Sequence, residues 1–531
     1  MAPDTNALYN AYAARDPRFD GVFYIGVTST GIYCRPVCTA RTPKAANCHF
    51  FDSAEAAEKA SFRPCLRCRP ELAPGNAPVD DAHRIANLIA HRIEEGMLDN
   101  GAGLEEVAAK FGWSSRQIRR IVHKQLGVSP MELVLTRRLL LAKQLLTETR
   151  LPMTEVAFAS GFASLRRFND AFSGRYGLAP TRLRKAANGA TKATIYGDSF
   201  TLQLAYRPPF DWTGMLRFLR VRTLKGVEQV DDEAYFRTVQ LGQHTGWIHV
   251  QNVAAKRTLL VELTHSLTPV LPALLGRLRN VFDLSARPDV ISARLMIDPL
   301  LAEIVAQNPG MRVPGAFEGF ELAVRAILGQ QITVKAATTL AGRFVNAFGD
   351  SITTPHEALT HLAPVPSRIA ELSVDDVASL GVIQSRARSI IALAVEVASG
   401  RLTLDAGADP DSIMKQLVAL PGIGTWTAHY IAMRALRWPD AFPKEDLALR
   451  NRLGGVSAAR AEELSRPWQP WRSYATLHLW QSPVQAATEV PSLTQPSSRA
   501  SQASAKRTSR ITVGAEEAST SAASSSVSPA K

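Results

Sequence analysis

The sequence has no cysteine after Cys68 and no long uncharged apolar run. All five cysteines lie in one N-terminal cluster, which excludes the disulfide framework of a secreted protein, where cysteines are spread along the chain. The first residues, "MAPDTNALYNAYAARD", contain no apolar signal segment. The leucine-rich run at 139–146 is flanked by Arg137 and Arg138 and interrupted by Lys143, so it is not a membrane span. We therefore expect a soluble intracellular protein without membrane contact.

The chain of 531 residues is too long for one ordinary domain. At about 100 to 200 residues per domain, three to five domains are expected. The 61 Lys and Arg residues outnumber the 48 Asp and Glu residues, which gives a formal net charge of +13. This charge favours a polyanionic partner, although many basic proteins bind nothing anionic.

The residue pattern changes several times along the chain. The cysteine cluster ends at a Pro- and Gly-rich linker, "LAPGNAP", and a basic helical stretch follows. Alternating apolar residues in "FTLQLAY" and "GWIHVQ" then predict an α+β unit, after which helical periodicity returns. The last stretch, rich in Ser, Ala and Thr with almost no aromatic residues, is expected to be disordered. The predicted parts are 1–75, 80–186, 194–288, 289–482 and a tail at 483–531.

Four of the cysteines form two closely spaced pairs. Cys34 and Cys38 lie in "GIYCRPVC", and Cys65 and Cys68 lie in "FRPCLRC". Thiolates this close in sequence can share one tetrahedral metal ion, so the two pairs predict a four-sulfur zinc site. Cys48 has no close partner and is expected to be buried and inert. The spacing alone leaves open whether the zinc ion is purely structural.

The segments "RDPRFDGVFYIGVTSTGIYCRPVCTAR" and "FRPCLRC" resemble the N-terminal domain of Ada-type methylphosphotriester repair proteins. The resemblance implies a small zinc-bound α/β domain in which Cys34 is both a zinc ligand and a nucleophile that accepts one methyl group from a DNA phosphotriester. Four thiolates on one zinc ion carry excess negative charge, so Cys34 can remain a thiolate without a nearby base. Methylation lowers this charge and the repulsion from DNA phosphates. The resemblance also assigns phosphate contacts to Arg41 and Arg67.

An internal repeat follows the cysteine cluster. "SSRQIRRIVHKQLGVSP" aligns with "SLRRFNDAFSGRYGLAP", and "EEVAAKFGW" and "TEVAFASGF" precede the two copies. Each copy reads as a helix, a Gly-containing turn and a second helix, and a long helix near 131–147 joins the copies. Ser114 and Gln117 predict a capping box, and Ser164 is the matching N-cap candidate in the second copy.

The second helix of each copy has an outward basic face. Ile118, Ile121 and Val122 are expected to face the core of the first copy. The outward basic residues are Arg116, Arg119, Arg120 and Lys124 in the first copy and Arg166 and Arg167 in the second. Such a face is commonly only solvated, but two Gly-turn units with basic second helices favour docking in the DNA major groove.

Residues 80 to 185 resemble the double helix-turn-helix domain of AraC-type regulators, which also follows the cysteine domain in Ada-type proteins. This implies sequence-specific transcription regulation as an activator, with RNA polymerase as a further partner. Ada-type proteins that repair O6-methylguanine carry a "PCHRV" motif. This chain has no cysteine after Cys68, so we expect that activity to be absent.

The stretch "LPGIGTWTA" contains Gly422 and Gly424, which allow a tight turn before a helix. Backbone N–H groups at such a turn can face a phosphate, but a lone turn of this kind is more commonly an ordinary connection. Asp446 stands before "LALR", where it can simply cap a helix N-terminus. A cap and a catalytic role are compatible.

Five ordered motifs resemble the helix-hairpin-helix glycosylase superfamily, most closely the DNA-3-methyladenine glycosylase II type: "YRPPFDWTGMLRFLRVR", "FELAVRAILGQQITV", "LPGIGTWTAHYIAMRAL", "DAFPKEDLALR" and "RPWQPWRSYATLHLW". The resemblance implies an α+β domain followed by an all-α helix-hairpin-helix domain. It places the catalytic aspartate at Asp446 and an auxiliary acid at Glu445. It places an aromatic pocket at Trp426, Tyr430 and Trp480.

These roles suit the excision of an alkylated base. A cationic purine flipped out of the stack favours an electron-rich aromatic cleft, and a carboxylate stabilises the oxocarbenium character that develops on the sugar. Bifunctional relatives have a lysine at the position of Trp426, so the resemblance implies a monofunctional enzyme. The lack of C-terminal cysteines excludes an iron-sulfur cluster. Gln331 stands where a leucine wedges into the DNA stack in a relative.

Together, the sequence predicts a multidomain DNA alkylation repair and response protein with zinc as its cofactor. Its fold class is a small zinc-bound α/β domain, an all-α double helix-turn-helix, an α+β domain, an all-α helix-hairpin-helix domain and a disordered tail. Its expected partner is double-stranded DNA, at alkylated and promoter sites, and we expect a monomer in the cytoplasm, at the bacterial nucleoid. One alternative is a transcription regulator whose glycosylase part only binds DNA. Another is a glycosylase with a purely structural zinc arm.

Overall fold

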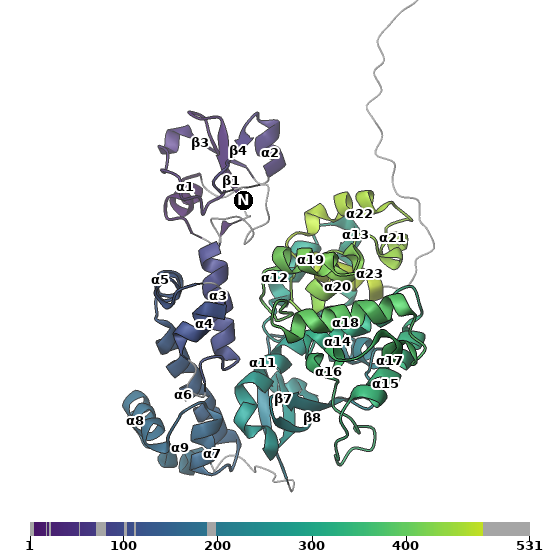
Figure 1. The fold of residues 1–531 in the computed structure, drawn as a ribbon. Coiled ribbons are helices and arrows are strands. Elements are labelled where there is room, and N and C mark those ends of the chain that lie inside the picture. The colour runs from purple at the N-terminus through teal and green to yellow at the C-terminus, as the bar shows by residue number, and fades with distance from the viewer. Residues whose placement is uncertain are drawn as a thin grey trace, which may run out of the picture. The chain divides into compact units, whose positions relative to one another are not determined.

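The computed structural model describes residues 5–16, 19–20, 23–51, 54–68, 70, 81–99, 103–110, 113–187 and 198–481 (Figure 1). The tail predicted at 483–531 lies outside the described residues. Among the described residues, no helix is both long enough and apolar enough to cross a membrane.

A four-stranded sheet organises the N-terminal part, with strand order β3-β1-β2-β4. The elements are α1 (Thr5–Ala13), β1 (Tyr24–Val27), β2 (Ile32–Cys34), the 3-10 turn η2 (Ala45–Asn47), β3 (Cys48–Phe51), α2 (Ala54–Lys59) and β4 (Arg63–Pro64). Strand β1 pairs antiparallel with β2 and β3, and β4 pairs parallel with β2. Ile25 and Tyr33 are fully buried between these elements. Because β2 ends at Cys34, the sheet fixes the position of that thiol.

Two helix-turn-helix units with matching caps form the next part. Its helices are α3 (Asp81–Glu94), α4 (Leu104–Lys110), α5 (Ser115–Leu126), α6 (Pro130–Glu148), α7 (Met153–Ala159), α8 (Leu165–Tyr176) and α9 (Pro180–Ala187). Ser114 and Gln117 form the predicted capping box at α5, and the Ser164 side chain caps α8 as predicted. Gly127 and Gly177 end α5 and α8 in the left-handed conformation, at φ 75° and 67°. The repeat in the sequence is therefore a repeat in structure.

The inward face of α5 differs in one residue from the prediction. Ile118 and Val122 are fully buried and share a core with Ile89 and Val134. Ile121 is only half-buried, because a helix carries residues i and i+4 on the same face and turns residue i+3 toward the edge of that face. In α8, Phe168 and Phe172 align with Ile118 and Val122, and both phenylalanines are fully buried.

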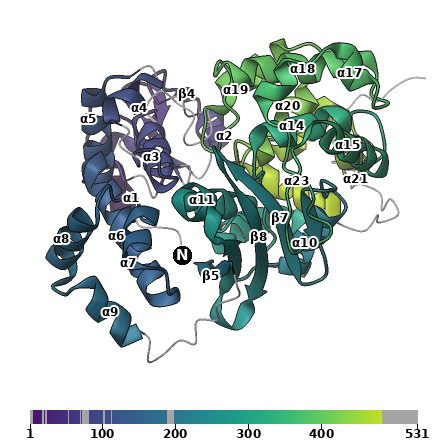
Figure 2. The same ribbon diagram turned by 60° about the horizontal axis from the view of Figure 1, so that its bottom comes forward.

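A five-stranded antiparallel sheet follows, with strand order β5-β9-β8-β7-β6. Its elements are β5 (Ser199–Ala205), α10 (Trp212–Arg220), β6 (Glu228–Val230), β7 (Ala234–Leu241), β8 (His244–Val253), η3 (Ala254–Lys256), β9 (Thr258–Thr264), η4 (His265–Val270) and α11 (Leu271–Val281). The period-two stretches of the sequence form β5 and part of β8, as predicted. Helix α11 lies beside this sheet (Figure 2), and its leucines pack into the same apolar core.

Helices build most of the last described part, around one apolar core. They are α12 (Pro288–Leu295), α13 (Pro299–Gln307), α14 (Gly319–Leu328), α15 (Val334–Phe348), α16 (Pro366–Ala370), α17 (Val374–Ala378), α18 (Gln384–Ala398), α19 (Pro410–Ala419), α20 (Thr425–Arg434), α21 (Leu447–Arg452), α22 (Ala458–Ser465), η5 (Arg466–Trp468) and α23 (Arg472–Gln481). The apolar helix α14 lies within this core, with Phe320 and the run Leu322–Ala323–Val324 buried. This core holds α20, α21 and α23, which carry the predicted site.

Candidate active site and metal centre

Helices α19 and α20 are joined by the turn that contains the two predicted glycines. Gly422 has φ 75°, and a Cβ there would lie 2.3 Å from Oγ of Ser389 on α18. Both its conformation and its surroundings therefore require glycine. Gly424 is the extended N-cap of α20, with open space where a Cβ would stand. Only Gly422 is demanded by the turn itself, and DNA contact at both glycines stays a prediction.

The loop between α14 and α15 is tied to this turn by Gln330, which the sequence analysis did not single out. Its side-chain Nε2 donates to the carbonyl oxygen of Gly422 at 2.9 Å and to Oγ1 of Thr427 at 3.1 Å. The guanidinium of Arg386 donates to the carbonyl oxygen of Gln330. The next residue, Gln331, is exposed at φ 53°, a conformation that non-glycine residues seldom adopt. The predicted wedge position is thus an exposed residue on a braced loop.

Asp446 caps a helix and also accepts hydrogen bonds from two predicted pocket residues. Its Oδ1 accepts the backbone N–H of Leu449 at 2.8 Å, which makes Asp446 the N-cap of α21. The indole Nε1 of Trp426 donates to Oδ2 at 2.9 Å, and that of Trp480 donates to Oδ1 at 3.0 Å. Both carboxylate oxygens are therefore held in place.

The three predicted aromatic residues lie together beside this carboxylate. Trp426 and Tyr430 are one turn apart on α20, and their rings stack with centroids 5.4 Å apart and planes 7° apart. The ring of Trp480 on α23 lies 6.3 Å from that of Tyr430, tilted by 44°. All three are only partly buried, so they present ring surface. A cluster of aromatic rings beside a fixed carboxylate is suited to stacking a planar cation and stabilising positive charge next to it.

Glu445 lies next to the capping carboxylate in sequence but has different contacts. Thr425 Oγ1 donates to its Oε1 at 3.1 Å. Its Oε2 is buried without a hydrogen-bond partner among the described residues. The structure brings Glu445 near the start of α20, and its auxiliary role stays a prediction.

Three residues behind the aromatic pocket were missed by the sequence analysis. Phe218 of α10 is flanked by two guanidinium groups: Cζ of Arg222 lies 3.9 Å and Cζ of Arg434 lies 5.0 Å from its ring centroid. Arg434 Nη1 also donates to the Tyr430 hydroxyl at 2.8 Å. Phe218 and Arg222 lie in the motif "YRPPFDWTGMLRFLRVR", so the signal was present, but spacing alone does not show which of its arginines turns inward.

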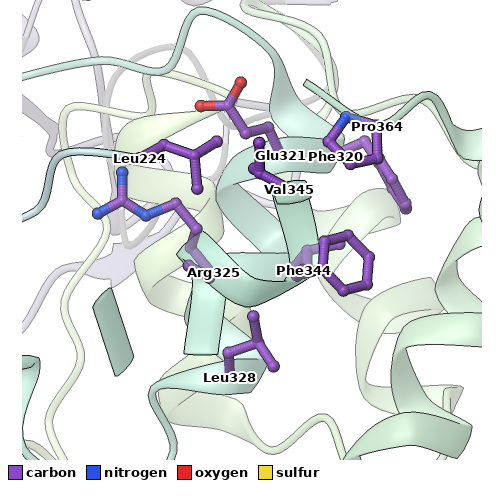
Figure 3. A pocket seen from close by; sticks show the side chains of 10 residues that line it. Leu224, Phe320, Glu321, Arg325, Leu328, Phe344, Val345 and Pro364 are labelled. Carbon is purple, nitrogen blue, oxygen red and sulfur yellow. The ribbon is translucent and has the colours of Figure 1, made fainter. Parts of the chain in front are cut away.

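A separate small pocket lies between α14 and α15 (Figure 3). Its lining is mostly apolar, with Leu224, Leu328, Phe344 and Val345 among the labelled side chains, and Arg325 is one of its few charged residues. None of the predicted site residues lines it. It is therefore distinct from the aromatic cluster beside Asp446.

Four thiols meet in the N-terminal part in a way that fits a metal ion. The Sγ atoms of Cys34, Cys38, Cys65 and Cys68 all lie within 4.8 Å of one another, and all four residues are buried. The Sγ atoms of Cys38 and Cys65 are 4.0 Å apart. Tetrahedral sulfur ligands at zinc–sulfur distance lie about 3.8 Å from each other, so a zinc ion fits this cluster. The predicted ligand set is the set that the structure brings together.

The backbone around this cluster and the fifth cysteine complete the site. The N–H of Arg35 donates to Sγ of Cys68 at 3.4 Å, while the buried Arg35 guanidinium pairs with Asp20. Cys48 lies outside the four-thiol group and donates to the carbonyl oxygen of Lys44 at 3.5 Å. Burial raises the pKa of the Cys48 thiol, which disfavours the reactive thiolate. Its predicted burial is confirmed.

The residues predicted to contact DNA phosphates in the N-terminal parts are all exposed. Arg41 and Arg67 lie beside the cysteine cluster in sequence, and Arg67 donates to the Thr39 carbonyl oxygen at 3.4 Å. On α5, Arg119 forms an ion pair with Glu105 at 3.2 Å. The remaining exposed basic residues are Arg116, Arg120, Lys124, Arg166 and Arg167. Exposure is compatible with DNA contact, which stays a prediction for each residue.

Comparisons with known families match four consecutive stretches of the chain. The metal binding domain of Ada matches residues 7–71, and a helix-turn-helix domain matches 107–186. The AlkA N-terminal domain matches 201–318, and the HhH-GPD superfamily base excision DNA repair protein model matches 324–470. The Ada match over the four clustered thiols identifies the metal as zinc. The predicted fold classes of the four parts are confirmed.

Known proteins match either the whole arrangement or one part of it. A protein of Mycobacterium tuberculosis, described as a probable bifunctional transcriptional activator/DNA repair enzyme AlkA, is 40% identical over 488 residues, which cover 90% of this chain and 97% of the relative. DNA-3-methyladenine glycosylase 2 of Escherichia coli is 34% identical over 52% of this chain and 95% of its own length. The bifunctional transcriptional activator/DNA repair enzyme Ada of E. coli is 36% identical over 23% of this chain and 33% of its own length.

The fold and the site define a base excision DNA repair protein of the helix-hairpin-helix class that also carries an Ada-type zinc domain and a helix-turn-helix domain. More specifically, the chain belongs to the family of bifunctional transcriptional activator/DNA repair enzymes represented by the M. tuberculosis relative.

Proposed function

We propose that this chain is a monofunctional DNA glycosylase that hydrolyses the N-glycosidic bond of alkylated bases such as 3-methyladenine. The observation that carries the proposal is the Asp446 carboxylate, held by the indole N–H groups of Trp426 and Trp480 beside a cluster of aromatic rings. The similarity to DNA-3-methyladenine glycosylase 2 of E. coli across half of the chain supports it.

In this mechanism the aromatic rings and the carboxylate act on different parts of the nucleotide. The flipped base stacks on Trp426, Tyr430 or Trp480, where the ring faces attract its positive charge. As the glycosidic bond breaks, its electron pair leaves with the base, and Asp446 stabilises the cationic sugar. Water then adds to the sugar carbon and loses a proton to the solvent, and Asp446 can orient that water.

The lyase reaction of bifunctional relatives needs an amine that forms a Schiff base with the sugar. Trp426 occupies the matching position, so we expect base release that leaves the DNA strand intact. The test is incubation of the zinc-loaded protein with methylated duplex DNA, with released base and strand breaks measured before any alkali treatment. Release of 3-methyladenine from intact strands supports the proposal. Strand cleavage, or no release, contradicts it.

A second proposed activity is the transfer of one methyl group to Cys34. A bond forms between Sγ of Cys34 and the methyl carbon, the bond between that carbon and the phosphotriester oxygen breaks, and its electron pair stays on the oxygen. Bound zinc holds the four cysteines as thiolates. Arg41 and Arg67 are exposed residues suited to contact the DNA phosphates.

Mass spectrometry after incubation with methylated DNA tests this step. We expect the peptide that contains Cys34 to gain the mass of one methyl group, and Cys48→Ser to leave that gain unchanged. A gain found only at other residues would contradict the assignment of Cys34 and leave the zinc site as purely structural.

The two helix-turn-helix units suit the third proposed role, sequence-specific binding at promoters. We propose that methylation of Cys34 strengthens this binding and that the protein then activates transcription, with RNA polymerase as a further partner. Equal promoter affinity before and after methylation would remove the switch but not the repair activities.

We also propose that the protein acts as a monomer in the cytoplasm, at the bacterial nucleoid, and that its domains are 1–75, 80–186, 194–288 and 289–482.

A further inference from the structure

Arg434 is a buried cation whose hydrogen bonds reach no carboxylate. It is 4% exposed. Its Nε donates to the carbonyl oxygen of Pro314 at 2.8 Å, its Nη2 to that of Gly315 at 3.0 Å, and its Nη1 to the Tyr430 hydroxyl at 2.8 Å. A buried charge is ordinarily paired with an opposite charge. Of the residues that the structure describes, only Tyr430 offers Arg434 a hydrogen-bond acceptor that can become anionic.

A second guanidinium approaches the same phenol from a different element. Arg222 follows α10, is half-buried, and donates from Nη1 to the Phe218 carbonyl oxygen at 3.1 Å. No carboxylate in the described part of the chain forms an ion pair with Arg222, and the ionisable groups that act on its pKa are Tyr430, Arg434 and Arg325. Burial lowers the pKa of Arg222, as expected for a cation without a carboxylate partner. Two under-compensated cations therefore converge on one phenol.

The other charged groups around Tyr430 do not supply the missing negative charge. Arg325 of α14 adds a further cation, but it is paired with Glu228 at 3.5 Å. Asp446 is held by hydrogen bonds from the indoles of Trp426 and Trp480. The groups that face the phenol are thus three arginines, of which Arg434 and Arg222 have no carboxylate partner among the described residues.

We propose that Tyr430 is the counter-ion of Arg434 and Arg222, and that its ionisation sets whether the pocket prefers a cationic or a neutral base. This inference rests on the proposed glycosylase function and names a specificity-determining charge within it. With a neutral phenol, the back of the pocket is cationic and repels a cationic base. With a phenolate, one positive charge is cancelled and the ring stacked on Trp426 becomes richer in electrons, which favours a cationic base.

The acidity of the phenol agrees with this geometry. Burial alone raises the pKa of Tyr430, but the charges of Arg434 and Arg222 and the hydrogen bond from Arg434 bring the pKa down to about 8. The folded-state pKa therefore lies below the ordinary value near 10, so the phenolate becomes populated as pH rises through the slightly alkaline range. The ionised fraction rises about tenfold from one pH unit below such a pKa to one unit above it.

The first test is a titration of the full-length, zinc-loaded protein by near-ultraviolet absorbance, which reports tyrosinate. We expect one phenol to ionise near the pKa given above in the wild type and in Tyr206→Phe, and to be missing in Tyr430→Phe. Tyr206 is a matched control because its hydroxyl donates to a neutral amide oxygen, that of Asn252, at 2.9 Å. Arg222→Gln should move the ionisation toward the ordinary tyrosine range, because one cation is removed. Ionisation of Tyr430 only in that ordinary range would overturn the proposal.

The second test follows base release under single-turnover conditions. The two substrates are DNA with 3-methyladenine, a fixed cation, and DNA with 1,N6-ethenoadenine, which is neutral, and spontaneous release is subtracted at each pH. We expect the ratio of cationic to neutral release to rise between about five- and tenfold across the ionisation, and to stay flat in Tyr430→Phe. A flat ratio in the wild type would overturn the specificity role.

The failure of this proposal is distinguishable from failure of the proposed function. If neither base is released at any pH, the glycosylase function is contradicted, and the absorbance titration alone then decides whether Tyr430 is the counter-ion. If both bases are released while Tyr430 titrates as an ordinary tyrosine, the function stands and the counter-ion is overturned.

Discussion

The indole Nε1 of Trp480 donates a hydrogen bond to Oδ1 of Asp446 at 3.0 Å, which joins α23 to the N-cap of α21. The indole of Trp426 donates to the other carboxylate oxygen at 2.9 Å. Two residues of the aromatic cluster therefore also orient the carboxylate beside it. Such fixed orientation lets a charge stabilise a transition state without reorganisation at the moment of reaction.

Replacing Trp480 by phenylalanine should separate its role in orienting the Asp446 carboxylate from its role in stacking on the base. Trp480→Phe keeps an aromatic ring but removes the N–H donor, so we expect base release to slow about tenfold, in line with the loss of a hydrogen bond to a charged group. Single-turnover release measures this. Trp471→Phe is the control, since Trp471 packs on Tyr474 in the same core. Equal slowing in both variants would attribute the effect to packing.

The brace formed by Gln330 should matter for binding damaged DNA. Gln330→Ala removes the side-chain hydrogen bonds to Gly422 and Thr427, so the loop with Gln331 is no longer fixed to the turn between α19 and α20. We expect affinity for a duplex with an abasic-site analogue to fall several-fold, with a melting temperature close to that of the wild type. Gln416→Ala, on the exposed face of α19, serves as the control in the same fluorescence-anisotropy titration. Unchanged affinity in Gln330→Ala would show that the loop needs no brace.

The basic face of α5 should govern the salt dependence of duplex binding. Each lost phosphate contact lowers the slope of log affinity against log salt by about one, because fewer counterions are released. We expect Arg119→Ala together with Arg120→Ala to weaken binding and to lower this slope by one to two, roughly. Binding isotherms at several salt concentrations measure it. A slope equal to that of the wild type would make these residues part of a merely solvated face.

His478 should make the helix-hairpin-helix part less stable in acid. Burial lowers the pKa of His478 to about 4. Between the ordinary histidine pKa near 6.5 and that value, the unfolded chain binds a proton that the folded chain does not. Stability is therefore fully present above the ordinary pKa and is lost as pH falls toward the folded one. The loss amounts to at most about 3 kcal/mol.

Urea unfolding followed by tryptophan fluorescence at several pH values checks this dependence. His478→Gln should be less stable at neutral pH, because the site is buried, but should lose less stability than the wild type on acidification. Parallel losses in the two proteins would mean that other groups cause the acid sensitivity.

Sequence reasoning found the features that depend on local spacing. The thiol pairs that include Cys34 and Cys65, the capping box at Ser114 and the alternation of β5 are all encoded within a few residues. Asp446 came from an ordered motif, and its cap is as local as the others.

What the sequence could not supply depends on contacts between distant residues. Arg434 meets Phe218 across more than two hundred positions, and Gln330 meets Gly422 across 92. No periodicity shows which of several arginines turns inward. The predictions for Gly424 and Ile121 were less exact for another reason. Glycine permits a tight turn without requiring one, and an apolar residue at the edge of a buried helix face need not itself be fully buried.

The central claim is that the Asp446 carboxylate does chemistry as well as capping. Asn caps a helix about as well as Asp, although an amide with one oxygen cannot accept from Leu449, Trp426 and Trp480 as the carboxylate does. We therefore expect Asp446→Asn to lose about 1 kcal/mol of stability and to bind DNA normally.

The most direct measurement is the single-turnover release of 3-methyladenine by wild type and Asp446→Asn. The account predicts release at least about 100-fold slower in the variant. Comparable rates would contradict it and leave Asp446 as a helix cap.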